Sequence, residues 1–437
     1  ILIGSHTGGF TPFSLNITPY LNGKSTHKLV VRVWDPSDKG YQPRGKQVAN
    51  PEGIWYTPVT GIWQTVWIEK VPECYIGHLK ITPLYDQSSI MIQMEEEHGI
   101  KDIDYEVTIT ARKMWPVKAS GKTGKPCVIM IPHMRSWSPE DPFLYDLHVR
   151  MGEDSVESYF AMRKVEVKND KEGIPRIFLN NEPYFEKGVL DQGYWPDGLY
   201  TPPCDEAMIY DIQKMKDLGF NMIRKHIKIE PQRWYYHCDR IGMLVWQDMV
   251  NGGREYKSWY VTWLATVMEG THIRAKDTRL HLMGRQDPTG QKQFESEMKE
   301  TIRRLYNHPS VVTWVIFNEG WGQFKTRKMT DIALAEDHTR LIDSASGWFD
   351  QGCGDIKSIH DYFFPLNITP EKRVTALTEF GGYSLQIPKH SMYEKDIYGY
   401  KIFKRKKDLS RAYEKLIKKL VIPNISRGLS VTVYTQL

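Results

Sequence analysis

The chain has 437 residues, of which 41% are hydrophobic, 12% aromatic and 25% charged, so it is rich enough in apolar side chains to exclude a wholly disordered protein. Lys and Arg exceed Asp and Glu by 58 to 53, an excess too small to indicate nucleic-acid binding. No apolar run approaches the roughly 20 residues that cross a bilayer. Five widely spaced cysteines without a CxxC pair exclude a zinc finger or a disulfide framework.

The two ends of the sequence indicate part of a longer protein. The first residue is Ile, and no charged segment followed by an apolar stretch is present, so no targeting signal is visible. The opening residues are typical of the middle of a β domain, and the closing string LSVTVYTQL is strand-like. We therefore expect a fragment, and the sequence leaves its localisation unknown.

The first 169 residues are patterned as β structure. Up to about residue 72, short β-branched runs such as 29–34 (LVVRVW) and 64–68 (QTVWI) alternate with Gly, Pro and Asp turns, which predicts strands. Further strands are predicted at 75–82, 89–94, 104–111, 126–131, 144–150 and 158–167. Their spacing, with no helical stretch between them, is typical of a small β-sandwich.

After residue 169 the hydrophobic period changes. Helices are predicted at 205–218, which follows Pro202-Pro203, at 294–305 and at 334–341. Short apolar strands are predicted between and after them at 222–224, 243–246, 312–317, 356–359, 376–378 and 429–434. Strands that alternate with helices over about 260 residues favour a (β/α)8 barrel, so the fold class is multidomain, β plus α/β.

Two glutamates stand where predicted barrel strands end, which is where barrel enzymes carry their chemistry. Glu319 follows the strand VVTWVIF through Asn318, and Glu379 follows TAL in TALTEFGGYS. A single glutamate of this kind is ordinarily an exposed loop carboxylate. Two that end buried strands, each followed by glycines that leave room for a ligand, can divide the roles of acid/base and nucleophile, as cleavage of a glycosidic bond requires.

Longer strings resemble glycoside hydrolase family 2, the group of β-galactosidases, β-glucuronidases and β-mannosidases. RGKQ (44–47) and GIWYTPVTGIWQTVWIEKVP (53–72) are similar to the end of the family's sugar-binding domain, and DIQKMKDLGFNMIRKH, WYYHCDRIGMLVWQD, YNHPSVVTWVIFNEGWG and ALTEFGG are similar to its barrel. The resemblance covers nearly the whole chain. It implies a partial jelly roll at 1–72, an immunoglobulin-like β-sandwich at 73–169 and a catalytic (β/α)8 TIM barrel at 170–437.

The resemblance also implies a role for several residues by position. Glu319 would be the general acid/base and Glu379 the nucleophile. Asn318 would hold the sugar 2-OH, Tyr362 would hydrogen-bond the nucleophile, and Arg224 would favour its ionised form. A packing role in the barrel is the competing interpretation of Tyr362.

Six more residues are expected around the sugar. They are Asp191, Gln192 and Trp195 after the first barrel strand, His226 after Arg224, His360 near Tyr362, and Tyr434 at the end of the last strand. For His360 a structural, hydrogen-bonded role is an equal interpretation. His226 departs from the Ser-His pair of many β-galactosidases, which weakens a galactose-type interpretation of this subsite. Tyr434 replaces the family's usual Trp, and either ring would suit stacking on a sugar.

We therefore predict a retaining exo-β-glycosidase that works by double displacement. By frequency in the family, β-galactosides are the first choice of substrate, with β-glucuronides, β-mannosides and arabinosides as alternatives. A non-catalytic carbohydrate-binding relative is disfavoured because the two carboxylates occur together with Asn318, Tyr362 and Arg224. An inactive fragment of a real enzyme is the third hypothesis.

The expected partner is a small carbohydrate, with neither nucleic acid nor membrane involved, and a homo-oligomer is left open. No cofactor is expected. His272 and His281 have no partner at metal-ligand spacing, so no catalytic metal is expected either, although some relatives hold structural cations.

Overall fold

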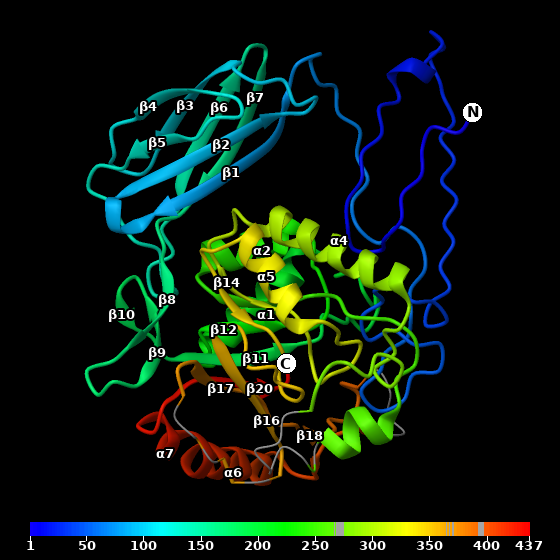
Figure 1. The fold of residues 1–437 in the computed structure, drawn as a ribbon, viewed down its shortest axis with the longest axis vertical. Coiled ribbons are helices and arrows are strands. Elements are labelled where there is room, and N and C mark those ends of the chain that lie inside the picture. The colour runs from blue at the N-terminus through cyan, green and yellow to red at the C-terminus, as the bar shows by residue number, and fades with distance from the viewer. Residues whose placement is uncertain (266, 268–274, 364, 367, 369–370, 392–396) are drawn as a thin grey trace.

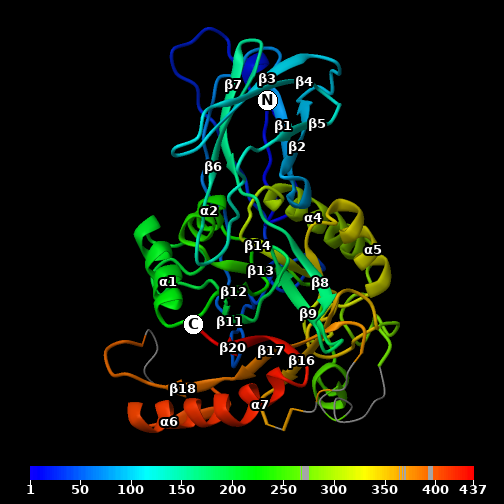
Figure 2. The same ribbon diagram turned by 90° about the vertical axis from the view of Figure 1, so that its left-hand side faces the viewer.

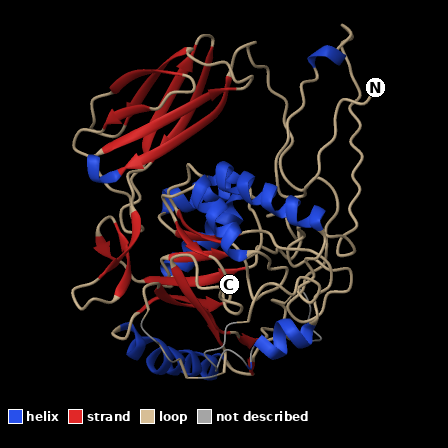
Figure 3. Ribbon diagram, in the orientation of Figure 1, coloured by secondary structure: helices blue, strands red, loops and turns tan. Residues whose placement is uncertain are grey.

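The computed structural model describes residues 1–437 except 266, 268–274, 364, 367, 369–370 and 392–396. Figure 1 shows a β-sandwich above a barrel, with the first residues running as an extended segment beside both. After a quarter turn the sandwich still lies above the barrel, and helix α6 lies below it (Figure 2). Helices surround the strands of the barrel and are absent from the described part of the sandwich, apart from one short turn (Figure 3).

The β-sandwich consists of two antiparallel sheets, of strand order β1-β2-β5 and β4-β3-β6-β7. Its strands are β1 (Ile76–Leu84), β2 (Ser89–Glu96), β3 (Asp104–Thr110), β4 (Val117–Lys122), β5 (Cys127–Met130), β6 (Tyr145–Met151) and β7 (Asp154–Phe160), with the 3-10 turn η2 at Tyr85–Gln87. Side chains of β6 alternate between buried and exposed, and the buried ones from both sheets form one core. This pattern confirms the predicted sandwich.

Two details of the predicted sandwich are wrong. The strand expected at 158–167 is two strands, because β7 ends at Phe160 and β8 (Val165–Asn169) begins a different sheet. Strand β4 has no counterpart among the predicted strands, because its sequence VKASGK is polar and buries none of its residues fully. β4 is held by its ladder to β3 rather than by an apolar face.

A small antiparallel sheet lies beside the barrel strands and contacts their N-terminal end (Figure 1). It contains β8, β9 (Pro175–Leu179) and β10 (Glu182–Pro183). Ile177 of β9 is buried in the same apolar cluster as the barrel residues Leu190, Met222 and Val431. Arg176 also donates a hydrogen bond of 2.9 Å to the backbone oxygen of Leu429. The other end of the barrel is left for the site.

Eight parallel strands form the barrel, in the order β15-β14-β13-β12-β11-β20-β17-β16. They are β11 (Glu186–Asp191), β12 (Met222–Lys225), β13 (Leu244–Asp248), β14 (Val311–Val315), β15 (Leu341–Asp343), β16 (Ile356–Asp361), β17 (Val374–Gly381) and β20 (Leu429–Thr435). Between β15 and β16 the backbone hydrogen bond from Asp355 to Ile342 (2.9 Å) nearly closes the ring. Strands β13, β14 and β17 are buried on both faces, which explains their apolar runs, whereas β16 alternates between buried and half-buried residues.

The other elements are one 3-10 turn in the N-terminal segment and the helices and short strands that lie between the barrel strands. They are η1 (Thr18–Tyr20), α1 (Asp205–Asp217), α2 (Gln232–Ile241), the π-helix η3 (Trp259–Leu264), α4 (Pro288–Leu305), α5 (Thr326–Glu336), β18 (Tyr383–Leu385), β19 (Lys401–Phe403), α6 (Lys406–Leu416), η4 (Ile417–Val421) and α7 (Ile422–Ile425). Asp287 caps α4 by accepting hydrogen bonds from the backbone of Thr289 and Gly290. None of the described helices combines the length and apolar character needed to cross a membrane.

The helix predicted at 334–341 is wrong. Helix α5 ends at Glu336, the next residue adopts an extended backbone, and Leu341–Asp343 forms the buried strand β15. The apolar residues that suggested one helix therefore belong to two elements. A three-residue buried strand cannot be distinguished from a helical stripe by periodicity alone.

The strands predicted at 29–34 and 64–68 are also wrong. Apart from isolated bridges, residues 1–72, all of which the structure describes, form no strand. Val30 and Trp67 are 73% and 67% exposed. β-branched residues favour a strand only where a neighbouring strand pairs with it and one face is buried, and these segments have neither.

Trp137 joins the sandwich region to the barrel. It is fully buried in the cluster that fills the barrel interior, and its Nε1 donates a hydrogen bond of 2.7 Å to the backbone oxygen of Asp239. We expect Trp137→Ala to lower the free energy of unfolding by about 3–5 kcal/mol in urea titrations. The matched variant Trp115→Ala, at a side chain 90% exposed, should change it by less than about 0.5 kcal/mol. Similar effects of the two would contradict this account of the junction.

Candidate active site

Two carboxylates meet at the C-terminal end of the barrel sheet. Glu319 lies in the loop after β14, and Glu379 lies near the end of β17. One oxygen of each carboxylate lies within 4.8 Å of an oxygen of the other. Glu379 is 5% exposed, whereas Glu319 is partly exposed, so Glu319 is the more accessible of the two carboxylates.

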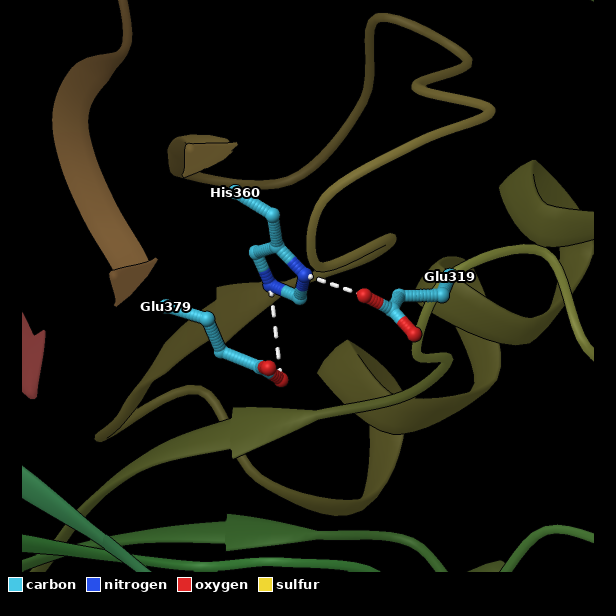
Figure 4. Close-up of side chains that lie close together, drawn as sticks. All are labelled: Glu319, His360 and Glu379. Carbon is cyan, nitrogen blue, oxygen red and sulfur yellow. Dashed lines mark hydrogen bonds and ion pairs between the residues drawn. The ribbon is translucent and has the colours of Figure 1, made fainter. Parts of the chain in front are cut away.

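His360 lies between the two carboxylates (Figure 4). Its Nδ1 is 2.9 Å from Glu319 Oε1, and its Nε2 is 3.7 Å from Glu379 Oε1 and 3.1 Å from Ser346 Oγ. Burial opposes a charge on the ring, but the two carboxylates outweigh it and raise the pKa of His360. Gly347 has a φ of +78°, and a Cβ there would lie 2.7 Å from Nδ1, so this glycine leaves the space that the ring occupies.

The guanidinium of Arg224 is fully buried and every side of it is engaged. It forms a two-point ion pair with Asp248, with both N–O distances 3.0 Å. It also donates to Asn318 Oδ1 at 2.8 Å, to the backbone oxygen of Thr378 at 3.2 Å and to Glu379 Oε1 at 3.3 Å. These contacts fix the carboxylate of Glu379 and the amide of Asn318 relative to one another.

Tyr362 holds the other oxygen of Glu379. Its hydroxyl donates to Glu379 Oε2 at 2.5 Å and lies 3.3 Å from Thr435 Oγ1. The ring of Tyr362 stacks on Tyr400, with centroids 3.9 Å apart. Both oxygens of Glu379 are therefore fixed by donors on different strands or loops.

The surroundings of Glu379 keep it ionised. Burial opposes its charge, but the positive field of His360, Arg224 and Lys46 outweighs burial and lowers the pKa of Glu379 to about 2. His226 would add to this field only when protonated, and burial lowers its own pKa, so it is neutral near pH 7. This carboxylate is therefore available as an anion over the whole physiological pH range.

The backbone is strained next to the site. Glu319 has a φ of +52° and Ile227 a φ of +53°, in the left-handed region that non-glycine residues rarely adopt. The N–H of Glu319 donates to the backbone oxygen of Ser346 at 2.9 Å, which holds the turn and aims the carboxylate into the barrel mouth. Positive φ at non-glycine residues also occurs elsewhere in the described chain, but at Glu319 it sets the direction of a carboxylate of the site.

By spacing alone, Glu319, His360 and Glu379 could hold a metal ion, since their ligand atoms lie within 4.8 Å of one another. The chemistry of the group favours a proton instead. The two carboxylates raise the pKa of His360, which favours the protonated ring, and Arg224 donates directly to Glu379. A metal ligand must be unprotonated, so these residues fit an ion-pair network better than a metal site. His272 lies outside the described residues.

Two family models match this chain. "Glycosyl hydrolases family 2, TIM barrel domain" matches residues 204–373, and "Glycosyl hydrolases family 2" matches residues 74–163, so together they cover more than half of the chain. The chain belongs to glycoside hydrolase family 2. The recognised family is thus confirmed, and the barrel match spans both the strand of Arg224 and Glu319.

Among curated family 2 proteins, a putative beta-glucuronidase of Formosa agariphila is 26% identical over 364 residues, which are 79% of this chain and 30% of the relative. A beta-galactosidase of Thermoanaerobacter pseudethanolicus is 22% identical over 414 residues, which are 87% of this chain and 49% of the relative. The matched part of the chain thus spans 30% and 49% of the length of these two relatives.

Solved structures share the fold. A beta-D-glucuronidase of Dictyoglomus thermophilum matches with a TM-score of 0.62 and 17% identity, over 83% of this chain and 62% of that one. A GH2 beta-galacturonidase from Eisenbergiella tayi matches with a TM-score of 0.61 and 18% identity, over 90% of this chain and 69% of that one.

The family 2 structure brings most of the predicted site residues together. Glu319, Glu379, Asn318, Arg224, Tyr362 and His360 form one connected network. His226 joins it through Asp248, whose Oδ2 lies 2.8 Å from His226 Nδ1. Gln192 lies at the rim and donates to Gln436 Oε1 at 3.0 Å.

Three predicted pocket residues lie elsewhere. Asp191 pairs with Lys225 at 2.5 Å, and Trp195 packs on the core between barrel and helices. Tyr434 packs against Phe380 and Tyr413, with centroids 5.6 and 5.0 Å away. Successive strand residues point to opposite faces, so a side chain next to an inward-facing one points away from the sugar side.

Sequence reasoning missed two members of the network. Asp248 ends the buried strand LVWQD, which is the same signal that marked the two glutamates, and it could have been found that way. Lys46, 8% exposed, comes from the RGKQ string of the N-terminal segment. Nothing in the sequence places that segment against the barrel mouth.

The low pKa of Glu379 makes a testable contribution to stability. Because the folded-state pKa of about 2 is below the ordinary 4.5, ionisation stabilises the fold; this contribution is complete above about pH 4.5 and is lost as the pH falls toward 2. Glutamine carries no such proton. The free energy of unfolding of Glu379→Gln should therefore fall less steeply than that of the wild type between about pH 5 and about pH 3 in urea titrations. Parallel pH profiles would show that Glu379 is not held as an anion.

Proposed function

We propose that the chain carries the active site of a retaining exo-β-glycosidase, with Glu379 as nucleophile and Glu319 as general acid/base. The observation that carries the proposal is the carboxylate pair, whose oxygens come within 4.8 Å. Retaining glycosidases place the two groups about 5–5.5 Å apart, whereas inverting enzymes need roughly 6.5–9.5 Å to admit a water molecule between acid and sugar.

In the first step Glu379 attacks the anomeric carbon while Glu319 gives its proton to the leaving oxygen. The bond to the aglycone breaks as the glycosyl-enzyme ester forms. In the second step Glu319 takes a proton from water, and the water oxygen displaces Glu379. Two displacements at the same carbon return the β configuration.

The surrounding groups suit this division of labour. Arg224, His360 and Tyr362 hold Glu379 as an anion, which a nucleophile must be. Glu319 is the more exposed of the pair and lies where a leaving group would depart. Because Asn318 Oδ1 accepts from Arg224, its amide N–H2 is the part left to donate to the sugar 2-OH.

For the sugar we propose a terminal β-galactoside, in line with the relatives named beta-galactosidase. A β-uronoside is the second candidate. It is favoured by the relative named as a putative beta-glucuronidase and by the fold match to a beta-galacturonidase. A panel of aryl β-galactoside, β-glucuronide, β-galacturonide and β-mannoside separates these candidates.

The two glutamates should differ in kinetics. Glu379→Gln should abolish turnover of every glycoside, because no substrate can form the covalent intermediate. Glu319→Ala should lower kcat/KM for an alkyl glycoside by about 10²- to 10⁴-fold, yet affect an activated aryl glycoside far less, because nitrophenolate leaves without a proton. Steady-state rates of the wild type and both variants on matched alkyl and aryl substrates measure this difference.

Azide decides which glutamate has which role. With Glu319→Ala, azide should restore turnover and give a β-glycosyl azide, because it replaces water in the second step. With Glu379→Ala, any azide product should be the α anomer. An α product from the Glu319 variant would reverse the assignment. Absence of activity in the wild-type chain on the entire panel would instead indicate a carbohydrate-binding relative or a segment that needs the rest of the protein.

A further inference from the structure

Two buried polar groups in the barrel mouth lack a hydrogen-bond partner among the described residues. Lys46 is 8% exposed, and its ammonium makes neither a hydrogen bond nor an ion pair with any residue that the structure describes. His226 is 2% exposed, and its Nε2 has no partner. Buried donors and acceptors without partners are costly, so such a pair points to a ligand that satisfies both.

The backbone places Lys46 next to His226. The N–H groups of Arg44 and Gly45 both donate to the backbone oxygen of Asn251, at 2.9 and 3.0 Å. Gly45 packs so closely on the residue after His226 that a Cβ on it would lie 3.0 Å from Ile227 O. The N-terminal segment that carries Lys46 is therefore fixed against the loop after β12, which carries His226.

Burial lowers the pKa of Lys46, while the charges of Glu379, Glu319 and Asp248 oppose that lowering and the charge of Arg224 adds to it. These four groups belong to the carboxylate network, so the side chain of Lys46 lies within range of their charges. The other cations there already have acceptors, since Arg224 donates to Asp248 and His360 contacts Glu319. Within the described part of the network, Lys46 is the cation whose N–H groups have no acceptor.

His226 offers the complementary group. Its Nδ1 lies 2.8 Å from Asp248 Oδ2, although the ring is not well aligned with that oxygen. A carboxylate at this distance places the ring proton on Nδ1, which leaves Nε2 as an acceptor. Burial and the charge of Lys46 lower the pKa of His226, so the ring stays neutral.

We propose that Lys46 and His226 together hold one hydroxyl group of the terminal sugar, with Lys46 Nζ donating to the hydroxyl oxygen and His226 Nε2 accepting the hydroxyl proton. The inference rests on the proposed function, which puts the sugar in this mouth. A hydroxyl both accepts and donates, so it satisfies both groups at once. A carboxylate would suit Lys46 but would face the lone pair of His226.

Because Asn318 is assigned to the 2-OH, the 3-, 4- and 6-OH are the groups that remain for this pair. The test compares Lys46→Met and His226→Phe with the wild type. The substrates are the 4-nitrophenyl β-glycoside that the wild type hydrolyses fastest and its 3-, 4- and 6-deoxy analogues. Methionine keeps the length and packing of the lysine stem without its charge. Lys39→Met, at an exposed lysine of the same segment, is the control.

In the wild type, one deoxy analogue should lose roughly 10- to 100-fold in kcat/KM, as expected for hydrogen bonds to a charged group. In Lys46→Met and in His226→Phe, kcat/KM for the parent glycoside should fall by about the same factor relative to the wild type. For that deoxy analogue, kcat/KM should be little lower in the variants than in the wild type. Lys39→Met should reproduce the wild-type pattern. This coupling would not arise from a merely structural role, because a structural defect lowers kcat/KM for all four substrates alike.

Calorimetric binding of the free sugar and its deoxy forms to the same proteins gives a readout that needs no turnover. If the wild type hydrolyses nothing, the proposed function fails, and the binding series still decides the roles of Lys46 and His226. The inference would be overturned if kcat/KM fell equally for all deoxy analogues, or if either variant discriminated between the parent glycoside and the deoxy analogue as the wild type does. It would also be overturned by no detectable sugar binding, or by a wild-type preference for uronosides that Lys46→Met removes. Thermal unfolding verifies that the variants fold.

Discussion

The arrangement of the site depends on one buried guanidinium. Arg224 is fully buried, and its donors reach Asp248 on β13, Thr378 and Glu379 on β17, and Asn318 in the loop after β14. Burying such a charge is unfavourable unless every donor is paired, and removal of a partner would leave an uncompensated charge. The guanidinium therefore fixes the relative positions of these groups, and the geometry between the two carboxylates follows from it.

The same network gives the two glutamates different environments. Glu379 lies among cations and donors that keep it ionised, with a pKa of about 2. Glu319 is more exposed and contacts His360 from the loop side. Two like groups a short distance apart can then perform unlike tasks, because their surroundings rather than their chemistry differ. The strained backbone at Glu319 indicates how closely its position is specified.

Sequence patterns predicted the barrel and the reacting pair because both rest on strong local signals. Buried parallel strands read as apolar runs, and Glu319 and Glu379 each end one. The failures involve information that is not local. Residues 29–34 are β-branched but have no strand to pair with, and Tyr434 turns away from the mouth because a single step along a strand reverses the face. Lys46 enters the site through packing between segments that are far apart in the chain.

Covalent trapping tests the central claim most directly. A 2-deoxy-2-fluoro β-glycoside with an activated leaving group forms the glycosyl-enzyme but releases it slowly, since fluorine destabilises both transition states. Mass spectrometry of the tryptic digest then locates the sugar. The account predicts a label on Glu379, in the peptide of residues 374–389. A label on Glu319, in the peptide of residues 305–325, or turnover that proceeds without any covalent adduct, would contradict it.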